Sequence, residues 1–351
     1  MPLTFSHPLR ARILCLGLGA LGGTIFYLLG LPLPWMMGAM TVTTIAAVSG
    51  VRIAIMPRVR MIFVAILGIM LGSAFTPQIL DHLQYWAISF LWLSLYIVVT
   101  TFLVRHYYIR FAGYDSVTAY FSAAPGGLSE MIMAGSAFGG DEARISLAHG
   151  ARILVAVFVL SLGYRWLGGY TPTGTGTGTI SNAAPLNLID LVWLTGAGVA
   201  GFFGARLIRL PAYALVGPMI VSAGLHVAGM TSSRPPAELV AVAQVVVGSM
   251  IGARFTGLPL RLVVRGIILA IGATGILLLV AAGFGFAVDA TAKMPFSSAL
   301  LAFAPGGLAE MSLIALALGI DAAYVSSHHV VRIFMIVVAA PLVFRLLGRK
   351  G

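Results

Sequence analysis

The sequence Ala-Pro-Gly-Gly-Leu-Ser-Glu-Met at residues 124–131 decides the fold of this chain, because it occurs twice. The second copy, Ala-Pro-Gly-Gly-Leu-Ala-Glu-Met at residues 304–311, differs at a single position. Each copy lies within an apolar run and combines a helix-breaking proline, two glycines and a carboxylate. A carboxylate at membrane depth is costly, so its presence in both copies indicates function rather than packing.

The composition around the two copies is that of an integral membrane protein. Of the 351 residues, 60% are hydrophobic and only 9% are charged, whereas soluble domains carry about 25% charged residues. The mean hydropathy is +1.02. Apolar runs of about 20 residues are typical of transmembrane helices rather than of barrel strands. The sequence therefore predicts an all-α polytopic membrane protein, with the lipid bilayer as its surroundings.

The sequence lacks the signatures of several other classes of protein. The net charge of +11 comes from arginines in short loops, where membrane topology and anionic lipid account for them. No basic patch with aromatic residues suggests nucleic acid as a partner. Cys15, the single cysteine, lies in an apolar run and is expected to be a buried core residue. No HExxH, cysteine cluster or phosphate-binding loop occurs, so we expect no metal, no cofactor and no enzymatic activity.

The two motif copies belong to a duplication of the whole chain. Glycines match throughout, for example Gly22 with Gly201 and Gly38 with Gly217, and we expect many of them to mark close helix packing. We assign residues 1–168 to the first membrane repeat, 169–187 to a Thr/Gly-rich linker and 188–351 to the second. The apolar segments, six in each repeat, are 11–29, 32–50, 57–76, 85–104, 116–138 and 146–167, then 190–208, 211–229, 238–257, 264–287, 297–318 and 324–346.

The fifth segment of each repeat carries the Pro-Gly-Gly break, and its path decides the symmetry. If it crosses the membrane, the repeats are parallel; if it is re-entrant, each repeat has five spans and the repeats are inverted. The inverted arrangement leaves only Arg165, Arg234 and Lys293 outside, apart from arginines within the segments. The parallel one puts the dense Arg254–Arg265 group outside, against the positive-inside rule. We therefore predict inverted repeats of about five transmembrane helices plus one broken or re-entrant segment each, with both termini cytoplasmic.

Each break is a candidate binding site. Two inverted halves with broken helices form the architecture of secondary transporters, whose half-helices meet near the membrane midplane. Helices that begin after the second glycine would direct free N–H groups at a ligand there. A kink for helix packing is the alternative. The residues at the breaks are Pro125, Gly126, Gly127 and Ser129, with Pro305, Gly306 and Gly307 in the second copy.

Three pairs of charged or titratable side chains, one of each pair in each repeat, complete the candidate site. Glu130 and Glu310 fall in the first turn after each break, where they either bind a coupling cation or proton or merely cap their helices. His149 and Arg152 are three residues apart and share a helical face, as do His329 and Arg332. We expect the arginines to pair with the glutamates; binding of an anionic substrate and a purely structural ion pair are alternatives. The histidines are either proton carriers or satisfied core residues.

The doubled motif, the Leu-Pro-Leu-Pro-Trp-Met-Met-Gly stretch at 31–38 and the His149/Arg152 block resemble the Gram-negative membrane AbrB family, with its AbrB duplication. The resemblance covers essentially the whole chain, although the second repeat lacks the Pro-Trp pair. It implies an inner-membrane protein with the plan of inverted-repeat transporters. Members carry labels such as ammonia monooxygenase or regulator AbrB, and neither label places chemistry on residues of this chain.

Three functions follow from these observations. The first is an inner-membrane secondary transporter that moves a small solute with H⁺ or Na⁺. The second is a membrane-embedded sensor or regulator of gene expression that acts through a partner. The third, a membrane monooxygenase, is the weakest because the metal or haem ligands it needs are not visible. The sequence leaves the solute, the coupling ion, the direction of transport and the formation of a homo-oligomer open.

Overall fold

The computed structural model describes residues 8–166, 168–169 and 187–348, and in these residues the chain forms helices and no strands. The linker expected at 169–187 lies almost entirely outside the described residues. The helices of the first repeat are α1 (Pro8–Leu28), α2 (Pro34–Val48), α3 (Pro57–Gly72), η1 (Pro77–His82), α4 (Leu83–Tyr107), η2 (Tyr108–Ala112), α5 (Ser116–Ala123), α6 (Leu128–Ala137) and α7 (Glu142–Trp166). Those of the second are α8 (Leu188–Leu207), α9 (Tyr213–Val227), α10 (Ala237–Ala253), α11 (Leu260–Ala292), α12 (Phe296–Phe303), α13 (Leu308–Ala317) and α14 (Ala322–Gly348).

This order confirms the expected all-α polytopic membrane fold. In the described part of the chain, α1, α4, α7, α8, α11 and α14 are long and apolar enough to cross a bilayer. The shorter α2, α3, α9 and α10 have 15 to 17 residues, fewer than the roughly 20 that a perpendicular span needs. In both repeats the fifth apolar segment is two half-helices, α5–α6 and α12–α13, as the Pro-Gly-Gly motifs predict.

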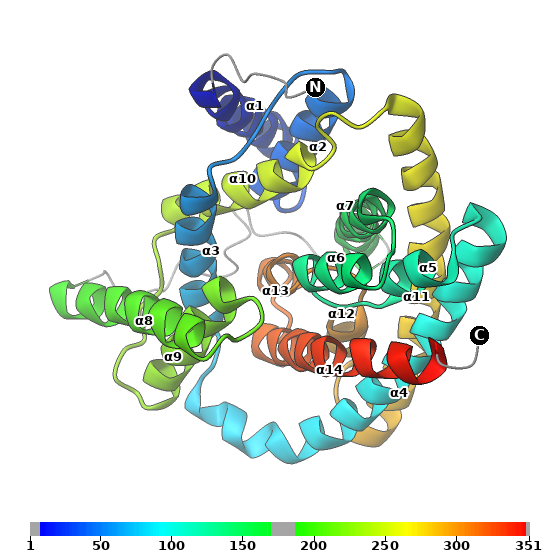
Figure 1. The fold of residues 1–351 in the computed structure, drawn as a ribbon. Coiled ribbons are helices and arrows are strands. Elements are labelled where there is room, and N and C mark those ends of the chain that lie inside the picture. The colour runs from blue at the N-terminus through cyan, green and yellow to red at the C-terminus, as the bar shows by residue number, and fades with distance from the viewer. Residues whose placement is uncertain (1–7, 167, 170–186, 349–351) are drawn as a thin grey trace.

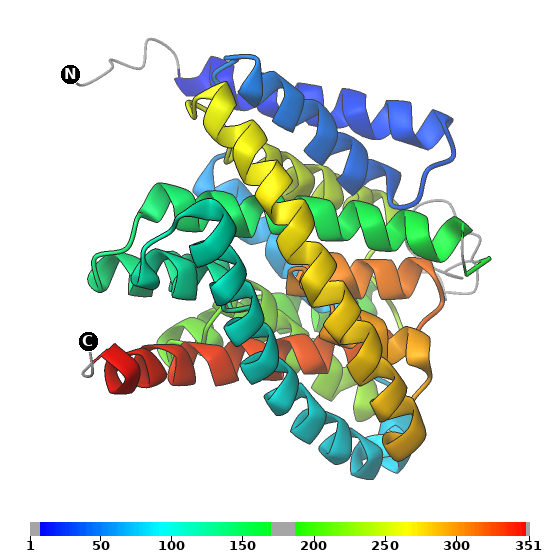
Figure 2. The same ribbon diagram turned by 90° about the vertical axis from the view of Figure 1, so that its right-hand side faces the viewer.

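The two repeats run in opposite directions. The equivalent helices α7 and α14 point to opposite sides of the molecule, and the equivalent helices α4 and α11 pack against each other antiparallel (Figure 2). The first described helix begins on the side where α14 ends (Figure 2). An inverted relation between the halves therefore follows from the course of the chain as well as from the arginines.

The helices form two groups that do not coincide with the repeats. We call α1, α2, α3, α8, α9 and α10 bundle one, and α4–α7 with α11–α14 bundle two; they lie side by side in Figure 1. Each repeat thus contributes its first three helices to bundle one and the rest to bundle two. The bundles contact each other chiefly through α13 and α14 against α3 and through α7 against α2.

Glycines bring the helices of bundle one together. A Cβ on Gly22 of α1 would collide with the backbone of Gly38 on α2, and one on Gly201 of α8 with the backbone of Gly217 on α9. These are equivalent pairs of the two repeats, which confirms the expected close packing at these positions. The matched Gly17 and Gly196, by contrast, have nothing within 4 Å of an added Cβ. The first residue before α2, Leu33, and its equivalent before α9, Ala212, share left-handed φ angles of 45° and 51°. The duplication thus preserves an unusual backbone conformation as well as sequence.

Candidate functional site

The backbone leaves the helical conformation over four residues in each motif. Helix α5 ends at Ala123 and α6 starts at Leu128, while α12 ends at Phe303 and α13 starts at Leu308. Proline interrupts the helix because it lacks an N–H and its ring clashes with the preceding turn. Each break therefore exposes the carbonyl end of one half-helix and the amide end of the next. The side chains of the candidate site lie at these two ends.

The glutamate of each motif folds back over the amide end. A Cβ on Gly127 would collide with the Glu130 carboxylate, and one on Gly307 with the Glu310 carboxylate. Glycine at these positions is therefore needed to let the carboxylate approach the backbone. Glu310 also accepts a hydrogen bond from its own backbone N–H. Both carboxylates lie where the dipole of the second half-helix favours a negative charge.

The histidine and arginine of the second repeat satisfy the carbonyl end of α12. His329 Nε2 donates to the Leu301 carbonyl at 3.0 Å. Arg332 donates from Nη1 to the Ala304 carbonyl at 2.6 Å and from Nη2 to the Gly306 carbonyl at 2.7 Å. Both side chains are buried. A guanidinium at the C-terminal end of a helix interacts favourably with its dipole, and its fork suits two acceptors.

The first repeat uses the same residues differently. His149 Nε2 donates to the Phe121 carbonyl at 2.8 Å, as in the second repeat. Arg152, however, donates from Nη2 to His149 Nδ1 at 2.8 Å, and its Nη1 is 3.5 Å from the Ser122 carbonyl, which is a weak contact. The predicted shared face of His149 and Arg152 is therefore confirmed by a direct hydrogen bond. The carbonyls of the first break do not receive the fork that Arg332 gives to the second.

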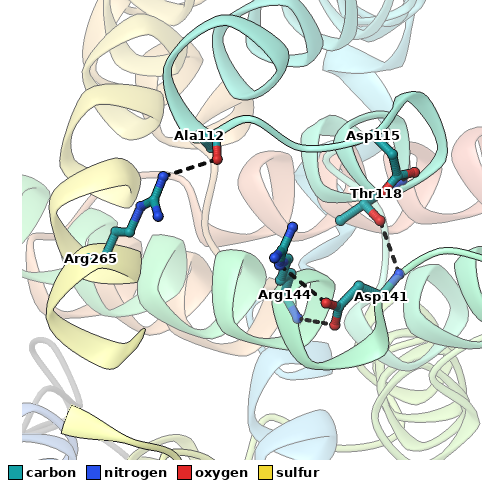
Figure 3. A network of polar contacts seen from close by, with 6 residues as sticks. All are labelled: Ala112, Asp115, Thr118, Asp141, Arg144 and Arg265. Carbon is teal, nitrogen blue, oxygen red and sulfur yellow. Dashed lines mark hydrogen bonds and ion pairs between the residues drawn. The ribbon is translucent and has the colours of Figure 1, made fainter. Parts of the chain in front are cut away.

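The expectation that Arg152 and Arg332 pair with Glu130 and Glu310 is wrong. Within the described residues the single ion pair is Asp141–Arg144 at 3.1 Å, on the exposed rim (Figure 3). The physical reason is that each residue type is bound at a different end of the break. The arginines are held by free carbonyls at the end of one half-helix, and the glutamates by the amide end of the next.

The two breaks differ in exposure. Glu310 is only 6% exposed and Ala309 8% exposed, whereas Glu130 is half-buried and Ser129 is exposed. Pro125 and Pro305 are both buried, as are His149, His329 and the two arginines. The same motif is therefore open to the surroundings in the first repeat and closed in the second.

The sequence analysis missed two further residues that lie near the candidate site. Arg254, at the end of α10 in bundle one, lies close enough to Glu310 and His149 in bundle two for its charge to act on both. Its equivalent in the first repeat is Ala74, so the charge is not duplicated. An arginine present in only one repeat could have indicated a role in the site. The topology argument instead counted Arg254 among the arginines of the loops. Tyr96 of α4 is buried near both Arg152 and Arg332, and no local sequence pattern marks it.

Several polar atoms around the breaks are buried without a hydrogen-bond partner among the described residues. They are Ser122 Oγ, Arg152 Nε, His329 Nδ1, Arg332 Nε, Ser312 Oγ and the Tyr96 hydroxyl. An unsatisfied buried polar group is costly, so such a cluster is typical of a place that receives a polar ligand or water. No three of the described His, Cys, Asp and Glu side chains gather as a metal site would require.

Comparison with known proteins places the whole chain in one group. It is 29% identical over 362 residues to the "Uncharacterized protein YhjN" of Bacillus subtilis (strain 168), with 95% of this chain and 92% of that protein covered. It is 25% identical over 324 residues to the "Putative regulator AbrB" of Escherichia coli (strain K12), with 92% of each covered. A family model described as "Transition state regulatory protein AbrB" matches residues 35–348. The chain, with its duplicated Pro-Gly-Gly break, therefore belongs to the AbrB family.

Proposed function

We propose that this chain is an inner-membrane secondary transporter that moves a small solute together with H⁺ or Na⁺. One observation carries the proposal: the same broken helix occurs in both inverted repeats, exposed in one and buried in the other. Transporters with inverted repeats bind their solute at such breaks and open alternately to the two sides. An asymmetric pair of breaks is what a single state of such a cycle requires.

Different groups of the candidate site bind the coupling ion and the solute. Glu130 and Glu310 bind the proton or cation. The carbonyls of Pro125 and Pro305 contact the solute together with Ser129. The amides and carbonyls of Gly126, Gly127, Gly306 and Gly307 also contact it. Arg152 and Arg332, supported by His149 and His329, hold the carbonyl ends and counter negative charge on the solute. The proposal assigns the chain no enzymatic activity and no cofactor.

The two bundles supply the movement. Bundle two contains both breaks, whereas Arg254 of bundle one faces Glu310 across the interface. Phe26 of bundle one also packs edge-on against Phe158 of bundle two, with ring centroids 6.4 Å apart. A largely apolar interface with one charge facing a carboxylate allows rigid-body displacement, and protonation of Glu310 or cation binding there would change its attraction to Arg254. Arg10, Arg12 and Arg345 lie on the side that the positive-inside rule makes cytoplasmic.

Reconstitution tests the proposal. Purified protein in liposomes is screened with candidate solutes while a proton-sensitive dye or a Na⁺ gradient reports coupling. Glu130→Gln and Glu310→Gln are compared with Glu142→Gln, which removes an exposed carboxylate from the start of α7. We expect solute-dependent ion movement in the wild type and the Glu142 variant and its loss in the other two. Coupled movement that survives both substitutions would overturn the role of these glutamates.

The name of the Escherichia coli relative and the family description favour a second candidate, a membrane-embedded regulator of gene expression. This function predicts a changed transcription profile on deletion of the gene, restored by chains that carry no solute. Complementation with the Glu310→Gln chain separates the two: a restored profile without solute movement would favour regulation. A profile that recovers only with transport-competent chains would make any regulation a consequence of transport.

A further inference from the structure

A groove on the outer surface of bundle two contains none of the motif residues in its lining. It has a volume of about 590 Å³ and lies between the start of α11 and η2. Its lining includes Phe111, Arg261, Val264, Arg265 and Ile268, and no acidic residue. The proposed transport site does not use any of these side chains. The groove therefore needs an explanation of its own.

One end of the groove is positively charged. Arg261 and Arg265 are four residues apart on α11, so their side chains leave the same helical face. Arg265 donates from Nη2 to the Ala112 carbonyl at 3.2 Å, which holds the guanidinium beside η2 (Figure 3). The first turn of α11 contains no acidic residue and its N-cap, Pro259, has no side-chain cap, so the amide end of the helix also attracts an anion.

Neither nearby carboxylate forms an ion pair with Arg261 or Arg265 among the described residues. Asp141 pairs with Arg144 (Figure 3). Asp115 accepts hydrogen bonds from the backbone N–H groups of Val117 and Thr118. Two arginines and an uncapped helix start therefore face the groove without a compensating acid. Two guanidiniums about one helical turn apart on the same helical face suit a phosphate group.

The remainder of the groove is apolar. Phe111 is 67% exposed, Val264 46% and Ile268 62%. Val264 and Ile268 belong to α11, which is long and apolar enough to cross a bilayer, and Phe111 of η2 lines the same groove. A free inorganic anion would leave these side chains uncovered, whereas a lipid acyl chain would cover them. Since the charged end sits at the beginning of a candidate span, it lies at the depth of lipid headgroups.

We propose that this groove binds one phospholipid with an anionic headgroup. The phosphate interacts with Arg261 and Arg265, and an acyl chain packs along Val264, Ile268 and Phe111. The bound lipid joins α11 to η2 at the point where Arg265 already joins them. The inference does not depend on the proposed transport function.

Thermal unfolding of the purified full-length protein with added phosphatidylglycerol, phosphatidylcholine or inorganic phosphate tests this site. The variant Arg261→Gln/Arg265→Gln is compared with Arg58→Gln/Arg60→Gln, which removes the same charge from exposed positions at the start of α3. We expect phosphatidylglycerol alone to raise the unfolding midpoint of the wild type and of the α3 variant. The groove variant should bind it at least about tenfold more weakly, the equivalent of about 1.4 kcal/mol.

A further variant, Val264→Asn, keeps both arginines and should also weaken phosphatidylglycerol binding because it disrupts the apolar wall. Native mass spectrometry of all four proteins counts the retained lipid independently of stability. Equal lipid retention by the wild type and the groove variant would overturn the proposal. So would a loss of equal size in the α3 variant, which would mean non-specific charge attraction, or equal stabilisation by inorganic phosphate, which would mean a site for a free anion.

Discussion

Arg152 and Arg332 occupy equivalent positions but make different hydrogen bonds. A buried guanidinium without a carboxylate is tolerated only when its N–H groups find acceptors. Arg332 finds two carbonyls of the second break, whereas Arg152 finds His149 and a distant carbonyl. The difference accompanies the difference in exposure between the two breaks. It suggests that each arginine changes its partners when its break opens or closes.

Replacing the guanidinium by an ammonium tests these contacts. Arg332→Lys keeps the charge but loses the two-pronged donation to the Ala304 and Gly306 carbonyls. We expect it to lower the free energy of unfolding by about 2–4 kcal/mol, since hydrogen bonds to charged groups contribute about 1.5–3 kcal/mol each. Arg152→Lys, which loses one good bond and one weak one, should cost clearly less. Unfolding of both variants in detergent measures the difference; an equal or reversed order would contradict the assigned roles.

At the scale of elements, glycine contacts determine how the helices of bundle one pack. Gly22 touches the backbone of Gly38 on α2, whereas Gly17, five residues earlier on the same helix, has nothing within 4 Å of an added Cβ. We expect Gly22→Ala to lower the free energy of unfolding by about 1–3 kcal/mol through overpacking. Gly17→Ala should be neutral or slightly stabilising because alanine favours helix. Thermal unfolding of the two variants compares the effect of one added methyl group at two places on α1. Equal changes in stability for the two variants would contradict the packing argument.

The start of α5 depends on its cap. Asp115 accepts hydrogen bonds from the backbone N–H groups of Val117 and Thr118 at 3.0 and 2.9 Å. Asp115→Ala should cost about 1 kcal/mol, and Asp115→Asn, which keeps an acceptor, less than half of that. Burial raises the pKa of the Asp115 carboxyl, and hydrogen bonds from Thr118 and Val117 lower it by a larger amount. The pKa of Asp115 is therefore below its ordinary value.

A lowered pKa gives the cap a definite pH dependence. The stabilisation is complete above the unfolded-state pKa of about 4 and is lost as the pH falls through the lower folded-state value. The difference in stability between wild type and Asp115→Asn should therefore shrink below about pH 4. Urea unfolding at pH 7 and at pH 3.5 measures it. A difference that grows towards acid would show that the carboxylate does not act as the cap.

At the scale of the whole molecule, local signals in the sequence are sufficient to predict the helices and the half-helices. All twelve apolar segments became helices or half-helix pairs, and α6 and α13 begin right after Gly127 and Gly307 as predicted. The antiparallel course of α7 and α14 agrees with the inverted repeats that the arginine distribution predicts. These features depend on hydropathy, proline and charge within short windows, which is why they can be read directly from the sequence.

Long-range partners could not be read in the same way. Gly68 of α3 packs against the Leu215 carbonyl of α9, and Gly248 of α10 against the Met36 carbonyl of α2. These contacts exchange helices between the repeats and create the two bundles, and no local pattern encodes them. The preference of Arg332 for carbonyls over Glu310 likewise depends on which ends of the half-helices face each other. Arg254 of bundle one acts on Glu310 of bundle two only because the two bundles pack together.

In the proposed transporter, the two breaks open alternately to opposite sides of the membrane. Ser129 and Ala309 are the one position at which the motifs differ, and they are exposed and buried, respectively. Single cysteines there, Ser129→Cys and Ala309→Cys, are made in a Cys15→Ser background, which removes the buried native thiol. A membrane-impermeant thiol reagent is then applied to vesicles of both orientations, with and without H⁺ and Na⁺ gradients.

We predict that the cysteine at 129 reacts from one side and the cysteine at 309 from the other. A condition that speeds one reaction should slow the other, because opening one break closes its equivalent. Labelling of both positions from the same side, or rates at the two positions that never change in opposite directions, would contradict alternating access and with it the proposed transporter.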